Sequence, residues 1–346
     1  MKKTKQIRYF FGLLFLLASW TTLQGCSSEN IQKLEGYAQG TTYHISYWPE
    51  SPVDNKKIKN DIETEFGTID KLLSNYRTDS VIETFNSAEN TEPFTVGPEI
   101  VSLVKTAQTV RQVSQGCYDL TIKPLFDLWG FQSETQAIPE KSAITKTMAQ
   151  IGMEKLEVVN ETQLRKKQPD LKVDLSSIAQ GYSVERISQI LEKYGIQNYL
   201  VEIGGELKTN GHKPDQQPWR IAVEKPLPGE RKLHKIIDMP LDLPYAVMTS
   251  GTYHHYFDEN GKRYSHILDA RTGRPVSHDV VSVTVIHNDP TLADAWSTAL
   301  LCLGQQAGMK AANAEKISAL FIQEQGSELI ESRSESLTAT QPFILH

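Results

Sequence analysis

The chain is poor in cysteine, with only 3 among 346 residues, and it contains no Cys-x-x-Cys spacing. This absence excludes a zinc site built from paired thiolates. Cys26 lies near the amino end, so Cys117 and Cys302 are the two cysteines left for the folded part. They could pair in an oxidising compartment, but both lie in apolar surroundings, and the sequence leaves their pairing open.

An excess of basic residues is also missing, since 36 Lys and Arg face 42 Asp and Glu, giving a net charge of −6. Proteins that bind nucleic acid are expected to carry a basic stripe or patch, so we expect no nucleic-acid partner. The chain has neither the G-x-G-x-x-G nor the G-x-x-x-x-G-K-[ST] fingerprint, which excludes the common dinucleotide and P-loop sites. No repeat with a period of about 20 to 50 residues is visible.

No apolar run reaches the roughly 20 residues that a membrane-spanning helix needs. The run from Tyr9 to Leu17 follows a basic segment and is typical of the apolar part of an export signal. The sequence L-Q-G-C that ends at Cys26 resembles a bacterial lipoprotein signal, in which the cysteine is lipidated and becomes the first mature residue. An uncleaved tethering helix is the alternative, and the short run argues against it.

We therefore expect a signal peptide over residues 1–25, a lipidated Cys26 with a tether over 26–35, and a folded domain over 36–346. Loss of residues 1–25 removes four positive and no negative charges, so the net charge changes from −6 to −10. Such a protein would be anchored to a bacterial cell membrane and face the periplasm or the exterior. Ser27, rather than Asp, after the cysteine favours the outer membrane, but the choice of membrane stays open.

Helical and strand patterns mix along the chain without a strict strand–helix–strand alternation. Helical spacing of apolar residues predicts helices over 53–73, 99–115 and 177–194, a short one before 151, and a helix pair over 291–314. Strands are predicted in 36–47 and near 156–159, 171–173, 199–203, 219–224, 246–250, 280–287 and 319–323. This mixture predicts an α+β fold with largely antiparallel sheet.

The segment Tyr264–Pro275, Y-S-H-I-L-D-A-R-T-G-R-P, concentrates polar chemistry around a Thr-Gly turn. His266 could move a proton, while Arg271 and Arg274 could steady an anion such as a phosphate-bearing substrate. A surface hairpin with ordinary polar residues is the alternative.

Two further segments combine oxygen-bearing side chains with a helix. Asp174 ends a predicted strand just before a helix that opens at Ser176 or Ser177, where free amides suit an anion, although a plain cap explains the pattern equally well. Asp294 and Thr298 are four residues apart and share a helix face, so they could hold a hard cation such as magnesium. A solvated helix cap is the alternative for Asp294.

Aromatic residues mark two other segments. Tyr76, in L-S-N-Y-R-T-D-S, could stack on an aromatic ring. In Gly116–Phe131 most aromatics should build core. Asp119, placed between Tyr118 and Leu120, needs a partner because a carboxylate among apolar residues is costly.

Together these motifs resemble the ApbE family of lipid-anchored FAD:protein FMN transferases, over nearly the whole mature chain. Six motifs stand in the family's order: N-Y-R-x-D-S, Y-D-x-T-I-x-P-L, D-L-S-x-I-A-x-G-Y, V-E-I-G-G-E, S-H-I-x-D-x-x-T-G-x-P and D-A-W-S-T-A. The resemblance implies a single α+β catalytic unit related to the T-fold. It also implies that FAD is the substrate, Mg²⁺ the cofactor, and AMP the leaving group after FMN is joined through a phosphoester to a Thr or Ser of a target protein.

The resemblance also implies roles for individual residues. Asp294, Thr298 and the backbone carbonyl of Ala179 would hold the metal, with Ser177 and Ser297 as further candidates. His266 would take the proton of the acceptor hydroxyl, or else orient the loop without proton transfer. FAD would be lined by Gln39, Tyr76, Cys117, Tyr118, Asp119, Asp174, Gln180 and Leu268. Gln39 replaces a common methionine and Gln180 a common lysine or glutamate, which leaves the affinity for FAD open.

Three activities fit this set of residues. The first is the transferase, acting on exported or membrane electron-transfer proteins that carry a D-x-x-[ST]-G-A-[ST]-like segment. The second is an FAD pyrophosphatase that releases FMN and AMP, and the third a lipid-anchored FAD-binding protein without turnover. His266, Asp294 and Thr298 argue against the third, because binding alone needs no metal.

Overall fold

The computed structural model describes residues 31–346, apart from 132–135, 228, 230–231 and 340. The proposed signal peptide and Cys26 therefore lie outside the described residues. Residues 31–346 form one compact unit. Within the described residues, no helix combines the length and apolar character that crossing a membrane requires.

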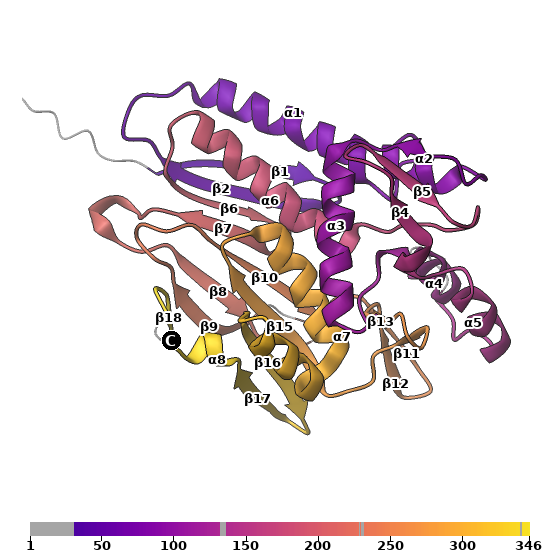
Figure 1. Ribbon diagram of the computed structural model, residues 1–346. Coiled ribbons are helices and arrows are strands. Elements are labelled where there is room, and N and C mark those ends of the chain that lie inside the picture. Colours follow the sequence, from indigo (N-terminus) through magenta and orange to yellow (C-terminus); the bar gives the residue numbers. More distant parts are fainter. Residues whose placement is uncertain (1–30, 132–135, 228, 230–231, 340) are drawn as a thin grey trace, which may run out of the picture. The chain divides into compact units, whose positions relative to one another are not determined.

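An eight-stranded sheet forms the centre of the fold, and every neighbouring pair of strands in it is antiparallel. In spatial order its strands are β1 (Gln32–Ala38), β2 (Thr41–Trp48), β6 (Asn198–Ile203), β7 (Glu206–Asn210), β10 (Tyr245–Gly251), β15 (Val280–His287), β16 (Ser318–Gln325) and β17 (Glu328–Arg333). The α+β fold with largely antiparallel sheet is thus confirmed (Figure 1).

Helices cover one face of this sheet: α1 (Asn55–Leu73), α6 (Ser176–Lys193) and α7 (Pro290–Ala314), with α3 (Pro98–Val113) packed against α6 and α7. Helix α1 illustrates why these segments fold: Asp54 caps it by accepting the Lys57 amide at 3.1 Å. Its apolar residues recur every three or four positions and all face the core: Ile58, Ile62, Phe66, Ile69 and Leu73.

A smaller sheet of β8 (Arg220–Glu224), β9 (Leu233–Asp238) and β18 (Ile344–Leu345) covers the other face. Alternation along β10 shows the two faces, because Ala246 and Met248 join the core under the helices while Val247 joins the core under the small sheet. The central strand β15 is buried from Val280 to Ile286, as a strand with both faces covered must be.

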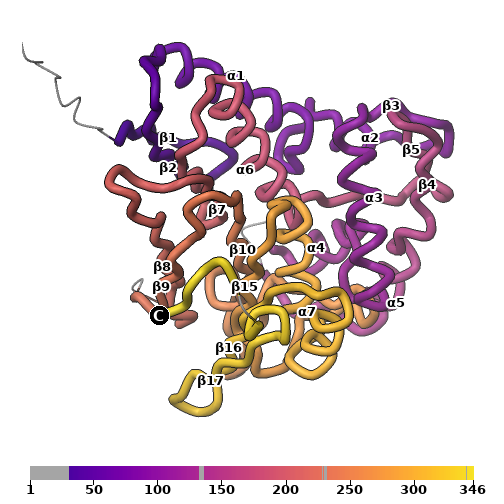
Figure 2. The backbone as a smooth tube through the Cα atoms, turned by 60° about the vertical axis from the view of Figure 1, so that its left-hand side comes forward, coloured from indigo at the N-terminus to yellow at the C-terminus, as the bar shows by residue number. Residues whose placement is uncertain are grey.

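Apart from α8, the remaining elements lie on the side of the molecule where α3 lies, away from β8 and β9 (Figure 1, Figure 2). They are α2 (Val81–Ser87), α4 (Lys123–Trp129), α5 (Lys141–Met148), the small sheet of β3 (Phe94–Thr95), β5 (Gln163–Lys166) and β4 (Leu156–Val158), and the hairpins β11 (Tyr256–Glu259) with β12 (Lys262–Ser265) and β13 (Leu268–Asp269) with β14 (Arg274–Pro275). Helix α8 (Glu335–Thr338) packs instead against β16. Short 3₁₀ turns η1 (Leu120–Ile122), η2 (Met153–Lys155) and η3 (Pro214–Gln216) complete the chain.

Several element boundaries differ from the sequence expectations. The single strand expected in 36–47 is a hairpin, because Gln39 and Gly40 both take positive φ angles of 52° and 77° and reverse the chain. Residues 171–173 are not a strand; their backbone is held instead by the Asn86 side chain, which bonds both the amide and the carbonyl of Val173. The expected helix pair over 291–314 is confirmed, because α7 consists of two helical segments that meet at Gly304, where φ is 74° and ψ −176°.

Candidate active site

The site is built where α6 and α7 approach each other most closely. Gly181 makes this approach possible, because a Cβ atom there would lie 2.3 Å from the carbonyl oxygen of Pro290 and 2.7 Å from Cβ of Asp294. The Gly181 amide donates to Oδ2 of Asp294 at 2.8 Å. The D-L-S-x-I-A-x-G-Y and D-A-W-S-T-A motifs therefore meet at the Asp294 carboxylate.

Asp294 is a buried carboxylate, with only 5% of its surface exposed. Burial raises its pKa to about 7, and the amides of Gly181 and Gln180 oppose that rise only in part. No Lys, Arg or His forms an ion pair with it among the described residues. The solvated helix cap considered from the sequence is therefore wrong, and a buried carboxylate of this kind suits a cation.

Three hydroxyl groups continue the site beside Asp294. Ser297 Oγ donates to the Asp294 carbonyl at 2.8 Å, while Ser250 Oγ lies 2.8 Å from Ser297 Oγ and 3.0 Å from Thr298 Oγ1. Because the Ser297 proton is already used, Ser250 must donate to Ser297, and Thr298 must donate to Ser250. This order leaves the lone pairs of Thr298 Oγ1 available to a ligand and makes Ser297 the weaker candidate.

A second carboxylate lies near Asp294 and was not singled out from the sequence. Glu206, at the start of β7, is 8% exposed and accepts the Thr249 amide at 3.0 Å. Burial and the nearby Asp294 raise its pKa well above the ordinary value, against the effect of that amide. Its position as the last residue of V-E-I-G-G-E was the available signal. Two buried carboxylates with hydroxyls beside them fit a hard divalent cation that would neutralise both.

The opening of α6 contributes the neighbouring polar groups. Asp174 accepts the amide and the hydroxyl of Ser176, so Ser176 and Ser177 start the helix but neither caps it, contrary to expectation. Ser177 Oγ donates to the Tyr118 hydroxyl at 3.1 Å. The carbonyl of Ala179 lies in the first turn of α6 and accepts Ser183 Oγ at 2.8 Å, so its role as a metal ligand stays a prediction.

The loop between α3 and α4 carries Cys117, Tyr118 and Asp119, and the structure gives each side chain a structural partner. Cys117 forms a disulfide with Cys302. The Asp119 carboxylate bonds Arg111 at 2.8 Å, the Thr121 amide at 2.8 Å and the Met153 amide at 3.0 Å. Its expected partner is therefore Arg111. Because these bonds occupy the carboxylate, the backbone is the part of this loop best placed to contact FAD. That contact remains a prediction.

The other predicted flavin residues come from four separate parts of the chain: the β1–β2 turn, α6, β13 and the loop between α1 and α2. Gln39 occupies the β1–β2 turn, and Gln180 Nε2 donates to the Ile203 carbonyl at 3.1 Å where β6 runs into Gly204. Leu268 is buried in β13, so its backbone rather than its side chain is open to a ligand. Tyr76 is 79% exposed, as a ring that stacks on an incoming flavin would be before binding.

His266 stands between the two hairpins with a defined tautomer. Its Nδ1 lies 2.9 Å from the carbonyl oxygen of His255, so Nδ1 carries the proton and Nε2 is the basic atom. Part of the ring reaches the surface, yet its pKa is lowered to about 4, mainly by the dense surrounding protein, with a smaller effect of His255 and His254 and with the hydrogen bond to the His255 carbonyl opposing the change. The imidazole is therefore neutral at pH 7 and can accept a proton.

The two arginines of the same segment do not form the expected anion clamp together. Arg271 makes a close ion pair with Asp269 at 2.8 Å, so its charge is neutralised within its own hairpin. Arg274 is exposed. The view of this turn as a hairpin with ordinary polar residues is thus correct for Arg271.

Comparison with known proteins agrees with this geometry. The chain is 38% identical to an FAD:protein FMN transferase of Vibrio cholerae over 335 residues, which cover 96% of this chain and 98% of that protein. It is 33% identical to the protein of that name from Escherichia coli K12, covering 91% and 93% of the two chains.

Solved structures show the same likeness. The flavin transferase ApbE of Vibrio cholerae superposes with a TM-score of 0.81 at 37% identity, over 89% of this chain and 98% of that one. The apo flavinyl transferase ApbE of Pseudomonas stutzeri gives 0.80 at 35% identity, over 89% and 96%. Because the sequence model described as the ApbE family also matches residues 39–321, the chain belongs to the ApbE family.

Proposed function

We propose that this chain is an FAD:protein FMN transferase that moves FMN from FAD to a Thr or Ser hydroxyl of a target protein and releases AMP. Support comes from the names of its relatives and from one observation above all. That observation is the pairing of the buried Asp294 carboxylate with the partly buried Thr298 hydroxyl where Gly181 lets α6 and α7 approach closely.

Magnesium is the cation that these residues fit. Asp294, Thr298 and the Ala179 carbonyl would hold it, and Glu206 would add a second negative charge nearby. When bound, Mg²⁺ neutralises charge on the pyrophosphate and so favours attack at phosphorus.

The protein residues supply binding and proton transfer. The amides of Ser176, Ile178 and Ala179 at the start of α6 are already bonded within the protein, so the metal would face the anionic part of FAD, while Tyr76 would cover a ring. The acceptor oxygen bonds to the phosphorus of the FMN half as the bond to the AMP phosphate breaks, and AMP leaves with that electron pair. Nε2 of His266 takes the hydroxyl proton, which its neutral state at pH 7 allows.

The acceptors are proposed to be exported or membrane electron-transfer proteins with a D-x-x-[ST]-G-A-[ST]-like segment. The transferase would encounter these acceptors outside the cytoplasm if Cys26 is lipidated after removal of residues 1–25. The anchored domain over 36–346 would then work at the periplasmic or outer surface of a bacterial membrane.

The test uses the purified full-length protein in detergent with FAD, Mg²⁺ and an acceptor domain that carries this segment. Intact mass spectrometry of the acceptor should show a gain of one FMN, which EDTA prevents and replacement of the target threonine abolishes. Release of FMN and AMP without acceptor labelling would instead establish a pyrophosphatase. Tight binding of unchanged FAD would establish a flavin carrier.

A further inference from the structure

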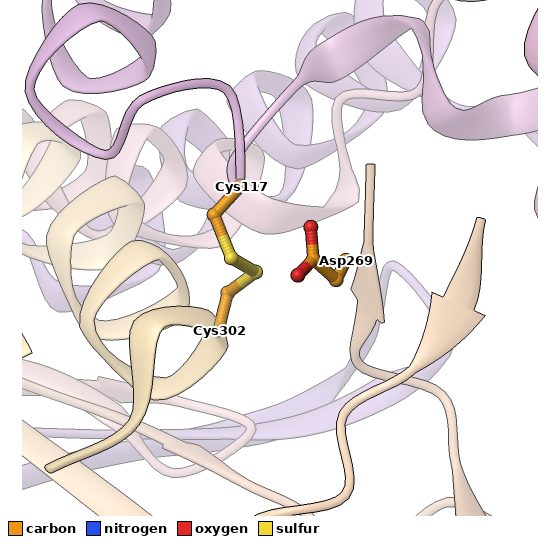
Figure 3. A group of neighbouring side chains, drawn as sticks. All are labelled: Cys117, Asp269 and Cys302. Atoms are coloured by element: carbon orange, nitrogen blue, oxygen red, sulfur yellow. A yellow bond between two sulfur atoms is a disulfide. The ribbon is translucent and has the colours of Figure 1, made fainter. Parts of the chain in front are cut away.

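The disulfide between Cys117 and Cys302 joins two parts of the candidate site that are 185 residues apart in sequence. Both cysteines are buried, with 1% and 4% of their surface exposed. Cys117 begins the loop of predicted flavin residues, and Cys302 lies on α7 (Figure 3). The bridge is therefore placed between the flavin side and the metal side of the site.

Cys302 lies on the same stripe of α7 as the proposed metal ligands. Asp294, Thr298 and Cys302 follow one another at intervals of four residues, which places them along one face of a helix. The helix is continuous through all three and breaks only at Gly304. At about 1.5 Å per residue, the bridge lies roughly 12 Å along the helix from Asp294.

The bridge also contacts the hairpin that follows His266. The Ala270 amide donates to the Cys117 carbonyl at 3.3 Å, and Cys302 Sγ lies 3.9 Å from the Leu268 carbonyl oxygen. An oxygen of the Asp269 carboxylate lies within 4.8 Å of both sulfur atoms, and its side chain is directed toward them (Figure 3). The loop, the hairpin and α7 thus meet at these two sulfurs.

The hydrogen bonds and ion pairs of this loop join it to elements other than α7. Tyr118 is bonded to Ser177 on α6, and Asp119 to Arg111 on α3 and to the Met153 amide in η2. In the described part of the chain, the hydrogen bonds and ion pairs of Tyr118, Asp119 and Thr121 do not reach α7. The covalent link is what fixes this loop to the helix of the metal ligands.

We propose that Cys117 and Cys302 are a positioning pair for FAD, which holds the loop at 117–119 and the β13–β14 hairpin in register with the metal ligands. This inference rests on the proposed function. A dithiol that reduces the bridge breaks the S–S bond, supplies two electrons and two protons, and is itself oxidised to a disulfide. The freed loop then binds FAD less tightly, while the contact of α6 with α7 at Gly181 and Asp294 stays intact.

The experiment compares the oxidised protein with its dithiol-reduced form and with the variant C117A/C302A. In both bridge-free forms we expect the Kd and KM for FAD to rise about tenfold, kcat to change less than twofold, and Mg²⁺ affinity without FAD to stay the same. The dithiol should have no effect on the variant, and reoxidation should restore the reduced protein. Alkylation of the denatured protein followed by mass measurement verifies the bridge.

A matched control variant distinguishes a loss of FAD positioning from a general loss of protein stability. Leu320→Ala removes buried side-chain volume under the small sheet, away from the site, so it should lower Tm without changing the KM for FAD. Unchanged FAD affinity in both bridge-free forms would overturn the inference, as would two free thiols in the isolated protein. If the oxidised protein itself neither binds FAD nor labels an acceptor, the proposed function fails first.

Discussion

At the scale of single residues, burial decides what the site can do. Asp294 and Glu206 could not be identified as a pair from the sequence, because they stand 88 positions apart (206 and 294) and meet only after β7 and α7 pack. Asp294 alone carried a recognisable signal, its spacing from Thr298. The tautomer of His266 was equally hidden, since it depends on the His255 carbonyl, which no spacing rule predicts.

Replacing Asp294 with Asn should abolish FMN transfer and weaken Mg²⁺ binding at least a hundredfold, while the amide side chain keeps the volume and the bond to Gly181. Calorimetric titration with Mg²⁺ and the acceptor mass assay measure the two effects. Retained transfer by D294N would contradict the metal role given to this carboxylate.

The affinity for Mg²⁺ should depend on pH through the same residue. Burial raises the pKa of Asp294 to about 7, so below that pH a proton competes with the cation, and above it the carboxylate is free to bind. Between pH 8 and pH 6 the affinity should fall about tenfold for one proton released. Calorimetric titration in buffers of different ionisation enthalpy measures the number of protons released on binding. A Mg²⁺ affinity that does not change with pH would contradict the prediction.

His266 should affect the pH dependence of the activity differently from Asp294. Its pKa of about 4 means that the ring stays neutral from pH 8 down to about pH 5, so its protonation alone costs no activity there. Activity of H266A should fall by roughly 10²–10⁴ if the ring is the general base, while FAD affinity changes little. A fall confined to FAD binding would instead assign His266 the role of orienting the loop.

At the scale of elements, the apolar periodicity predicted the long helices well, because α1, α3 and α6 each bury one stripe, while α7 is buried on nearly all sides up to Gly304. Short strands were missed for a physical reason. β7 is buried over its first four residues, whereas β9 and β17 are mostly partly buried or exposed, so none shows the regular alternation of a half-buried strand, although each pairs with the strand just before it. Strand order could not be predicted at all, since pairing is decided by packing rather than by local preference.

The close contact of α6 and α7 can be tested at Gly181. G181A places a methyl group 2.3 Å from the Pro290 carbonyl, so the helices must separate. We expect a loss of about 1–3 kcal/mol in the free energy of unfolding and a loss of Mg²⁺ binding. Urea unfolding and calorimetry measure both, with G67A in α1, where an added Cβ meets nothing within 4 Å, as the matched control. Normal metal binding by G181A would show that the spacing does not matter.

At the scale of the whole molecule, both faces of the central sheet are buried, by helices on one side and by β8, β9 and β18 on the other. The family could be identified from the order of six motifs, and the comparison confirmed it. The prediction of where the protein is located in the cell depends instead on residues 1–30, which lie outside the described part of the chain.

Replacing Cys26 with Ser should therefore separate location from chemistry. In bacterial cells we expect C26S to leave the membrane fraction, because the thiol that would carry the lipid is gone, while the purified variant labels its acceptor at the normal rate. Cell fractionation with immunoblotting and the mass assay measure the two. Membrane retention of C26S would contradict lipidation at this residue.

The pairing of β2 with β6 has a consequence for synthesis. Tyr43 of β2 lies opposite Ile203 of β6, so the centre of the sheet closes only after a long stretch of chain has been made. Contacts this distant in sequence close slowly, because the entropy of a long loop must be lost first. The helix that carries Asp294 and Thr298 is added later still, so a nascent chain that ends between residue 119 and α7 contains the predicted flavin loop without the proposed metal ligands.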